Sequence, residues 1–123
     1  MRGWLNRIFG DAGERAAVRY LKRSGYRIIC RNFENRFGEI DIIAFDANTL
    51  VFIEVKTRRT MQRGTPVEAV DSRKQQQILK TAQSYLKQRQ LYYTSVRYDI
   101  IGVLWPDNET EPEITHLRAA FPE

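Results

Sequence analysis

The chain has 123 residues, 42% hydrophobic and 28% charged, which predicts one globular domain over residues 1–123 and excludes a disordered chain. Its only cysteine is Cys30, so no intramolecular disulfide can form, and we expect a reducing, cytoplasmic location. Polar residues interrupt every apolar run in residues 1–10, which argues against a signal peptide or a membrane span. We therefore expect no membrane partner.

The net charge of +5 is unevenly distributed along the chain. Residues 1–104 contain 19 Lys and Arg against 10 Asp and Glu, whereas residues 105–123 contain one against five. A strongly basic body predicts a polyanionic partner and favours nucleic acid. The alternative is that these basic residues only solvate the surface, and charge alone does not choose between the two interpretations.

After an N-terminal arm, residues 1–10, the first expected element is a helix with Asp11 as its N-cap and Gly25 as its stop. Glu14 projects from the apolar stripe of this helix, where an unpaired carboxylate would be costly to bury. It has two candidate roles, as a capping-box residue at N3 or as a ligand in a polar pocket, and spacing alone favours the cap. The stripe consists of Ala17, Val18, Leu21 and Tyr20.

A strand is expected from Tyr26 to Asn32, then an irregular connection at residues 33–37, and then a hairpin with strands at about residues 38–45 and 50–58. The turn-forming residues 46–49 separate the hairpin strands. If the turn is centred between Ala47 and Asn48, Asp41 lies opposite Glu54 and Glu39 lies opposite Lys56.

The predicted opposition of Asp41 and Glu54 is unusual because like charges in directly opposed strand positions destabilise a sheet. At a separation of about 5 Å and an effective dielectric constant of ~20, two carboxylates repel by roughly 3 kcal/mol. A divalent cation between hard oxygen ligands would offset this repulsion, with Lys56 beside it to orient a water or balance charge. The alternative is a surface hairpin whose polar face carries mixed charges, with Glu39 and Lys56 as an ordinary cross-strand pair.

The second half of the chain predicts a crossover from one strand to the next. Thr65–Glu68 has the pattern of a capping box, and Ser72 is expected to open a longer helix that reaches about Gln90. A core strand at residues 98–104 follows, and a strand–helix–strand order predicts parallel pairing with the hairpin. The acidic tail, residues 105–123, is expected to add an edge strand at residues 114–117. His116 is expected to be structural, and Asp99 is a secondary candidate for the site.

Together these residues resemble a known superfamily. Asp41, followed by Glu54-Val55-Lys56, with a helical glutamate upstream and a helix and strand downstream, resembles the PD-(D/E)xK nucleases, especially the archaeal Holliday junction resolvases. The chain resembles the bacterial YraN family of uncharacterised proteins more closely still. Three segments carry this resemblance: Gly38-Glu39-Ile40-Asp41-Ile42-Ile43-Ala44, Phe52-Ile53-Glu54-Val55-Lys56-Thr57-Arg58 and Ile114-Thr115-His116-Leu117-Arg118-Ala119-Ala120-Phe121.

The resemblance implies an α/β fold with a restriction-endonuclease-like αβββαβ core, in which helices flank a mixed sheet. It implies that Asp41, Glu54 and the Val55 carbonyl bind metal, and that Lys56 lies near the attacking water. Glu14 corresponds to the helical glutamate that completes the resolvase site, which raises its ligand role above the cap. Ile40 stands where many members of the superfamily have proline, a departure that other members share.

The implied activity is Mg²⁺-dependent hydrolysis of phosphodiester bonds, with Mn²⁺ as a substitute, in DNA that is branched or damaged. Glu39 would support the site. A homodimer is expected if the substrate is a junction, since its resolution needs two active sites. The alternative is a non-catalytic nucleic-acid-binding or adaptor domain with the same fold. The residues expected to contact nucleic acid are Arg31, Arg36, Arg58, Arg59, Arg63 and Lys74.

Overall fold

The computed structural model describes residues 2–62, 64–106 and 110–121. Two helices and five strands follow one another in the order α1 (Arg2–Arg23), β1 (Arg27–Asn35), β2 (Gly38–Asp46), β3 (Thr49–Arg58), α2 (Ser72–Gln88), β4 (Ser95–Leu104) and β5 (Glu113–Leu117). Neither helix of this described part is long and apolar enough to span a membrane.

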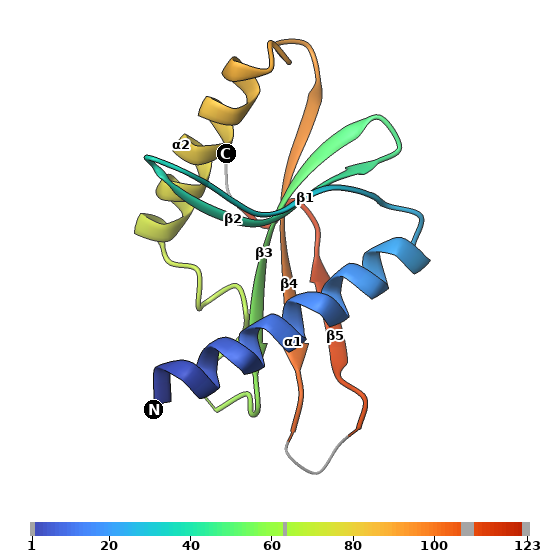
Figure 1. The fold of residues 1–123 in the computed structure, drawn as a ribbon, viewed down its shortest axis with the longest axis vertical. Helices are drawn as coiled ribbons and strands as arrows, with labels where there is room; N and C mark the ends of the chain where they lie inside the picture. The colour runs from blue at the N-terminus through green and yellow to red at the C-terminus, as the bar shows by residue number, and fades with distance from the viewer. Residues whose placement is uncertain (1, 63, 107–109, 122–123) are drawn as a thin grey trace.

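The strands form one mixed sheet in the order β1-β2-β3-β4-β5. β3 and β4 pair in parallel, as the crossover predicted, and the other three neighbouring pairs are antiparallel. α1 crosses one face of the sheet and α2 lies against the other (Figure 1). This α/β arrangement is consistent with the restriction-endonuclease-like core that the resemblance implied.

Each face of the sheet has its own hydrophobic core, and strand periodicity separates the two. Along β3, Val51 and Ile53 pack with α1 residues such as Leu21, whereas Leu50 and Phe52 pack with α2 residues such as Ile78. Successive side chains of a strand point to opposite faces, so the consecutive residues Leu50–Glu54 of β3 are all buried, on one side or the other. The charged residues of β3 begin at Glu54, where the strand leaves the two hydrophobic cores.

The hairpin register agrees with the sequence prediction, but only over part of its length. β2 and β3 pair from Asp46↔Thr49 to Ile42↔Ile53, which centres the turn between Ala47 and Asn48. Beyond Ile42 the ladder ends, while β2 continues to pair with β1. The expected Glu39–Lys56 pair is therefore wrong, because β2 diverges from β3 and Glu39 lies opposite Glu34 of β1 instead.

The start of α1 also differs from the sequence prediction. Residues expected to form a separate arm are helical from Arg2, so Asp11 lies inside the helix and cannot be its N-cap. Gly3 and Gly10 lie within the helix, and Phe9 and Ala12 of its N-terminal half are half-buried. Gly25, with φ +89°, follows the end of the helix as expected.

The end of β1 and the start of α2 also differ slightly from the sequence prediction. β1 runs through the expected irregular connection as far as Asn35, with a register shift between Ile28 and Cys30. The N-cap of α2 is Asp71 rather than Ser72, since the Asp71 side chain accepts the Lys74 N–H at 2.9 Å. The Thr65–Glu68 capping box is present, with the Thr65 hydroxyl 3.0 Å from the Glu68 carboxylate.

Candidate active site

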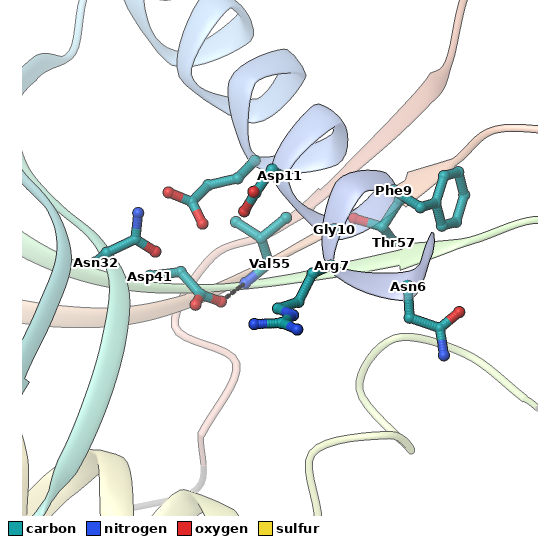
Figure 2. A pocket seen from close by; sticks show the side chains of 10 residues that line it. Asn6, Arg7, Phe9, Gly10, Asp11, Asn32, Asp41, Val55 and Thr57 are labelled. Carbon is teal, nitrogen blue, oxygen red and sulfur yellow. Dashed lines mark hydrogen bonds between the residues drawn. The ribbon is translucent and has the colours of Figure 1, made fainter. Parts of the chain in front are cut away.

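Asp41 lies at the point where β2 leaves β3. Its Oδ2 atom accepts the backbone N–H of Val55 at 2.8 Å, a bond that the side chain makes where the strand ladder has stopped (Figure 2). The Asp41 side chain is thus bound to the strand that carries Glu54. The two carboxylates meet because of this side-chain bond as well as the hairpin register.

Glu54 is the most perturbed carboxyl group of the site. It is 7% exposed, and its burial raises its pKa to about 8, with further contributions from a hydrogen bond to the Asp41 side chain and from the charge of Asp41. The positive charges of Lys74 and, to a smaller extent, Lys56 oppose this rise. A carboxylate pair with this perturbation is typical of a functional site, although structural ion pairs also shift pKa values.

Glu14 approaches the same place from α1. Its carboxylate is buried at 6% residue exposure, and its Oε1 accepts from Nη2 and Nε of Arg31 at 3.2 and 3.3 Å. Burial and the charge of Asp41 raise the pKa of Glu14, while Arg31 lowers it. Because α1 begins well before Asp11, the capping-box role is excluded, and the polar pocket is the remaining explanation for this buried carboxylate.

Two lysines lie near Glu54. The Lys74 Nζ atom, from the first turn of α2, is 3.7 Å from the Glu54 carboxylate. Lys56 is on β3, half-buried, and makes no ion pair within 4 Å with another described residue. Lys74 thus has the Glu54 carboxylate as a direct partner, whereas Lys56 affects Glu54 only through its charge.

An open pocket of about 440 Å³ is lined by the Glu14 and Asp41 carboxylates, whereas Glu54 is not among its lining residues. Figure 2 shows Arg7 of α1 and Asp41 of β2 pointing into it. The sequence prediction missed Arg7 and Asn6 because residues 1–10 were expected to form an arm. The pocket is lined by Asn6, Arg7, Phe9, Gly10, Asp11, Glu14, Asn32, Asp41, Val55 and Thr57.

The basic residues expected to bind nucleic acid have different surroundings. Arg36 is exposed over the Phe37 ring and shares a second pocket with Glu39 and Lys74. Arg58 lines a third pocket with Lys56, and the Arg59 guanidinium stacks over the Phe9 ring at 4.1 Å. Arg63 lies outside the described residues. Arg31 and Lys74 instead contact the carboxylates of the site, which no sequence signal had predicted.

The donor set fits a hard divalent cation in part. Asp41 and Glu54 offer carboxylate oxygens, and Val55 offers a backbone carbonyl, which are the ligand types preferred by Mg²⁺. No three His, Cys, Asp or Glu side chains of the described residues are close enough together to hold a metal by themselves. Since Mg²⁺ typically keeps several waters and binds through one or two carboxylates, two adjacent carboxylates are sufficient. Glu14 would then act through water.

Asp99 and His116 do not join this site. Asp99 is fully buried and accepts hydrogen bonds from Arg97 and from the Ala119 N–H, and His116 Nε2 lies 2.7 Å from its Oδ2. The Tyr20 hydroxyl lies 2.8 Å from His116 Nδ1, which connects the cluster to α1. His116 therefore has the structural role that was expected, and no contact among the described residues links Asp99, the secondary candidate, to the site.

With the site described, comparison with known proteins is informative. The model of the uncharacterised protein family UPF0102 matches residues 13–103, which include Glu14, Asp41 and Glu54. The chain belongs to this family, which is the YraN family. The resemblance to the YraN family that the motifs indicated is thereby confirmed.

Individual UPF0102 proteins match over almost their whole length. One from Geobacter sulfurreducens is 48% identical over 118 residues, which cover 94% of this chain and 90% of the relative. One from Geotalea daltonii is 46% identical over 116 residues, covering 94% and 91%. One from Persephonella marina is 44% identical over 121 residues, covering 98% and 97%. None of these names assigns an activity.

Proposed function

We propose that this protein is a metal-dependent nuclease that hydrolyses phosphodiester bonds in DNA, with branched or damaged DNA as its substrate. One observation carries the proposal: the Glu54 carboxyl group is buried beside Asp41, and burial together with this neighbour raises its pKa to about 8. Ionising Glu54 next to Asp41 therefore costs free energy, and a divalent cation bound between the two groups would offset that cost. The basic body of the chain supplies the field that attracts a polyanion.

The roles of the residues follow from their places. Asp41, Glu54 and the Val55 carbonyl would hold Mg²⁺ or Mn²⁺, which when bound polarises a phosphoryl oxygen and lowers the pKa of a water. Lys56, which makes no ion pair within 4 Å with any residue that the structure describes, would place the attacking water or stabilise developing negative charge. Glu14 would orient water from the opposite wall of the pocket. Arg7, Arg36 and Arg58 would contact phosphates around these groups.

A nuclease of this kind would act in the cytoplasm, where bacterial DNA is found and where Cys30 would stay reduced. A homodimer would be required if the substrate is a four-way junction, because two strands must then be cut symmetrically. Both statements depend on the proposed activity.

The test is cleavage by the purified chain. We expect labelled four-way, overhanging and duplex DNA to be cut in Mg²⁺ or Mn²⁺ and to remain intact in EDTA. Glu54→Gln should abolish cleavage, whereas Arg19→Gln, an exposed change on α1, should not affect it. Equal residual cleavage by the wild type and Glu54→Gln would show that a contaminant is responsible and would overturn the proposal.

A second candidate, a non-catalytic nucleic-acid-binding or adaptor domain, is favoured by one observation. Glu14 and Glu54 already have cationic partners within the chain, Arg31 and Lys74, so the site is partly neutralised without a metal. This alternative predicts salt-dependent DNA binding that is indifferent to divalent cations and to Glu54→Gln. A stoichiometric metal-binding isotherm that Asp41→Asn removes would exclude it.

A further inference from the structure

Arg31 and Lys74 are each the cationic partner of a carboxylate of the candidate site. Each pairs with a buried carboxylate, Arg31 with Glu14 at 3.2 Å and Lys74 with Glu54 at 3.7 Å. The carboxylate side chains are 9% and 8% exposed, whereas the side chains of Arg31 and Lys74 are 40% and 34% exposed. The anions are therefore enclosed, and the cations lie at the boundary with solvent.

The two cations also come from different elements. Arg31 is on β1 and Lys74 is in the first turn of α2, so the carboxylates lie between them. Lys74 additionally lines the pocket that contains Arg36 and Glu39. Both cationic side chains therefore reach solvent from their present backbone positions, on the side where a phosphate would approach.

We propose that Arg31 and Lys74 are exchangeable counterions that couple metal binding to nucleic-acid binding. They pair with Glu14 and Glu54 until a divalent cation binds at Asp41 and Glu54, with Glu14 directed to it through water, and they are then released to contact phosphates of the substrate. Because the exchange is reciprocal, the metal tightens nucleic-acid binding and nucleic acid tightens metal binding by the same factor. This inference rests on the proposed function and specifies how that site is loaded.

Coupling of this kind differs from ordinary phosphate contact in one measurable way. An ordinary basic residue that binds phosphate weakens DNA binding equally with and without metal when it is removed. An exchangeable counterion is engaged by its carboxylate when metal is missing, so removing it costs little under that condition. Removing such a residue is therefore expected to weaken DNA binding only in the presence of metal.

The test compares DNA affinity in EDTA and in Ca²⁺, a hard cation that probes the site through oxygen ligands. The probe is a fluorescent duplex with a single-stranded overhang, measured by anisotropy at fixed ionic strength. We expect Ca²⁺ to tighten binding by the wild type about tenfold or more. For Arg31→Gln/Lys74→Gln we expect the Ca²⁺ effect to shrink to about threefold or less, while its loss of affinity in EDTA is no larger than that of a variant with the same loss of charge elsewhere.

The chain offers a matched control for this double variant. Arg27→Gln/Lys80→Gln removes one charge from β1 and one from α2 at exposed positions away from the carboxylates, so the net charge changes equally. We expect this control to keep the Ca²⁺ effect of the wild type. The single variant Lys74→Gln, on an exposed helix turn, provides the same test if the double variant does not fold.

A second measurement follows Mn²⁺ binding without DNA by calorimetry. Removing two competing cations should tighten Mn²⁺ binding by about tenfold in Arg31→Gln/Lys74→Gln. Unchanged or weaker Mn²⁺ affinity, or an equal loss of DNA affinity in EDTA and Ca²⁺, would overturn the inference while leaving the proposed function intact. A wild type that binds neither Mn²⁺ nor Ca²⁺ would overturn both.

Discussion

Glu54 on β3 and Asp99 on the adjacent strand β4 are both buried carboxyl groups, but their surroundings are opposite. Asp99 receives hydrogen bonds from Arg97 and the Ala119 N–H and contacts His116, and although burial alone would raise its pKa, these bonds hold it below the usual range. Glu54 lies instead against another carboxyl group, and its pKa is raised to about 8.

The comparison teaches how to separate structural from functional burial in this fold. A buried carboxylate whose oxygens are all satisfied stabilises the protein and needs nothing from solution. A buried carboxylate that faces a like charge is a cost that a structural role does not explain. The Asp99 cluster connects β4, β5 and α1, whereas the Asp41–Glu54 pair is the part of the sheet where we propose that a metal binds.

Among substitutions that test this difference between the two clusters, we expect the largest effect on activity from a change at Asp41. Asp41→Asn keeps an acceptor for the Val55 N–H but removes the charge, so we expect DNA cleavage to fall on the order of a thousandfold. The free energy of unfolding should be unchanged or higher, because the repulsion with Glu54 is removed. Cleavage rates and urea denaturation measure the two effects. A large loss of stability would mean that Asp41 is structural, like Asp99.

The corresponding substitution in the Asp99 cluster should reduce stability and leave DNA cleavage almost unchanged. Asp99→Asn replaces one acceptor oxygen by a donor that faces Arg97 and His116, so we expect the free energy of unfolding to fall by about 3 kcal/mol. Cleavage per folded molecule should stay within a few fold of the wild type, since no group of this cluster reaches the pocket. Urea denaturation and active-site titration separate the two quantities. Loss of cleavage in a fully folded variant would contradict the comparison.

The pH dependence of stability sharpens the comparison further. Because the pKa of Glu54 in the folded state is about 8, above the ordinary 4.5, the folded state binds this proton more tightly than the unfolded state does. Its contribution is fully present below pH 4.5 and is lost as the pH rises through about 8. We therefore expect Glu54→Gln to become more stable relative to the wild type, by a few kcal/mol, as the pH rises through this range.

Chemical denaturation in EDTA at several pH values measures that difference. Saturating Mn²⁺ should stabilise the wild type most at high pH, where the metal no longer competes with a proton, and should have little effect on Glu54→Gln. A difference between the two proteins that does not change with pH would mean that Glu54 is ionised throughout, as a satisfied carboxylate would be.

The smallest effects concern α1, which carries Glu14. A Cβ atom at Gly13 would overlap the Thr57 side chain of β3, so Gly13→Ala should push α1 from the sheet and cost about 1–3 kcal/mol. Gly10 has no such neighbour, and Gly10→Ala should stabilise the helix by about 0.5–1 kcal/mol. Thermal denaturation measures both. Destabilisation by Gly10→Ala would indicate that α1 begins at Asp11 after all.

The sequence by itself determined the local framework of this protein. The turn residues 46–49 and the period of two along β3 established the hairpin register, and the crossover order established the parallel pairing of β3 and β4. These features depend on neighbours in the chain, so residue patterns are sufficient to predict them. The presence of Asp41, Glu54 and Lys56 near one end of the hairpin follows from the same patterns.

Only the tertiary structure decided how these groups are connected. β2 leaves β3 after Ile42, so Asp41 binds the Val55 N–H and Glu39 moves away from Lys56. The packing of α1 and α2 on opposite faces brings Glu14 to Arg31 and Lys74 to Glu54, which are contacts between distant parts of the chain. Such contacts depend on how strands diverge and helices pack, and no local periodicity encodes them.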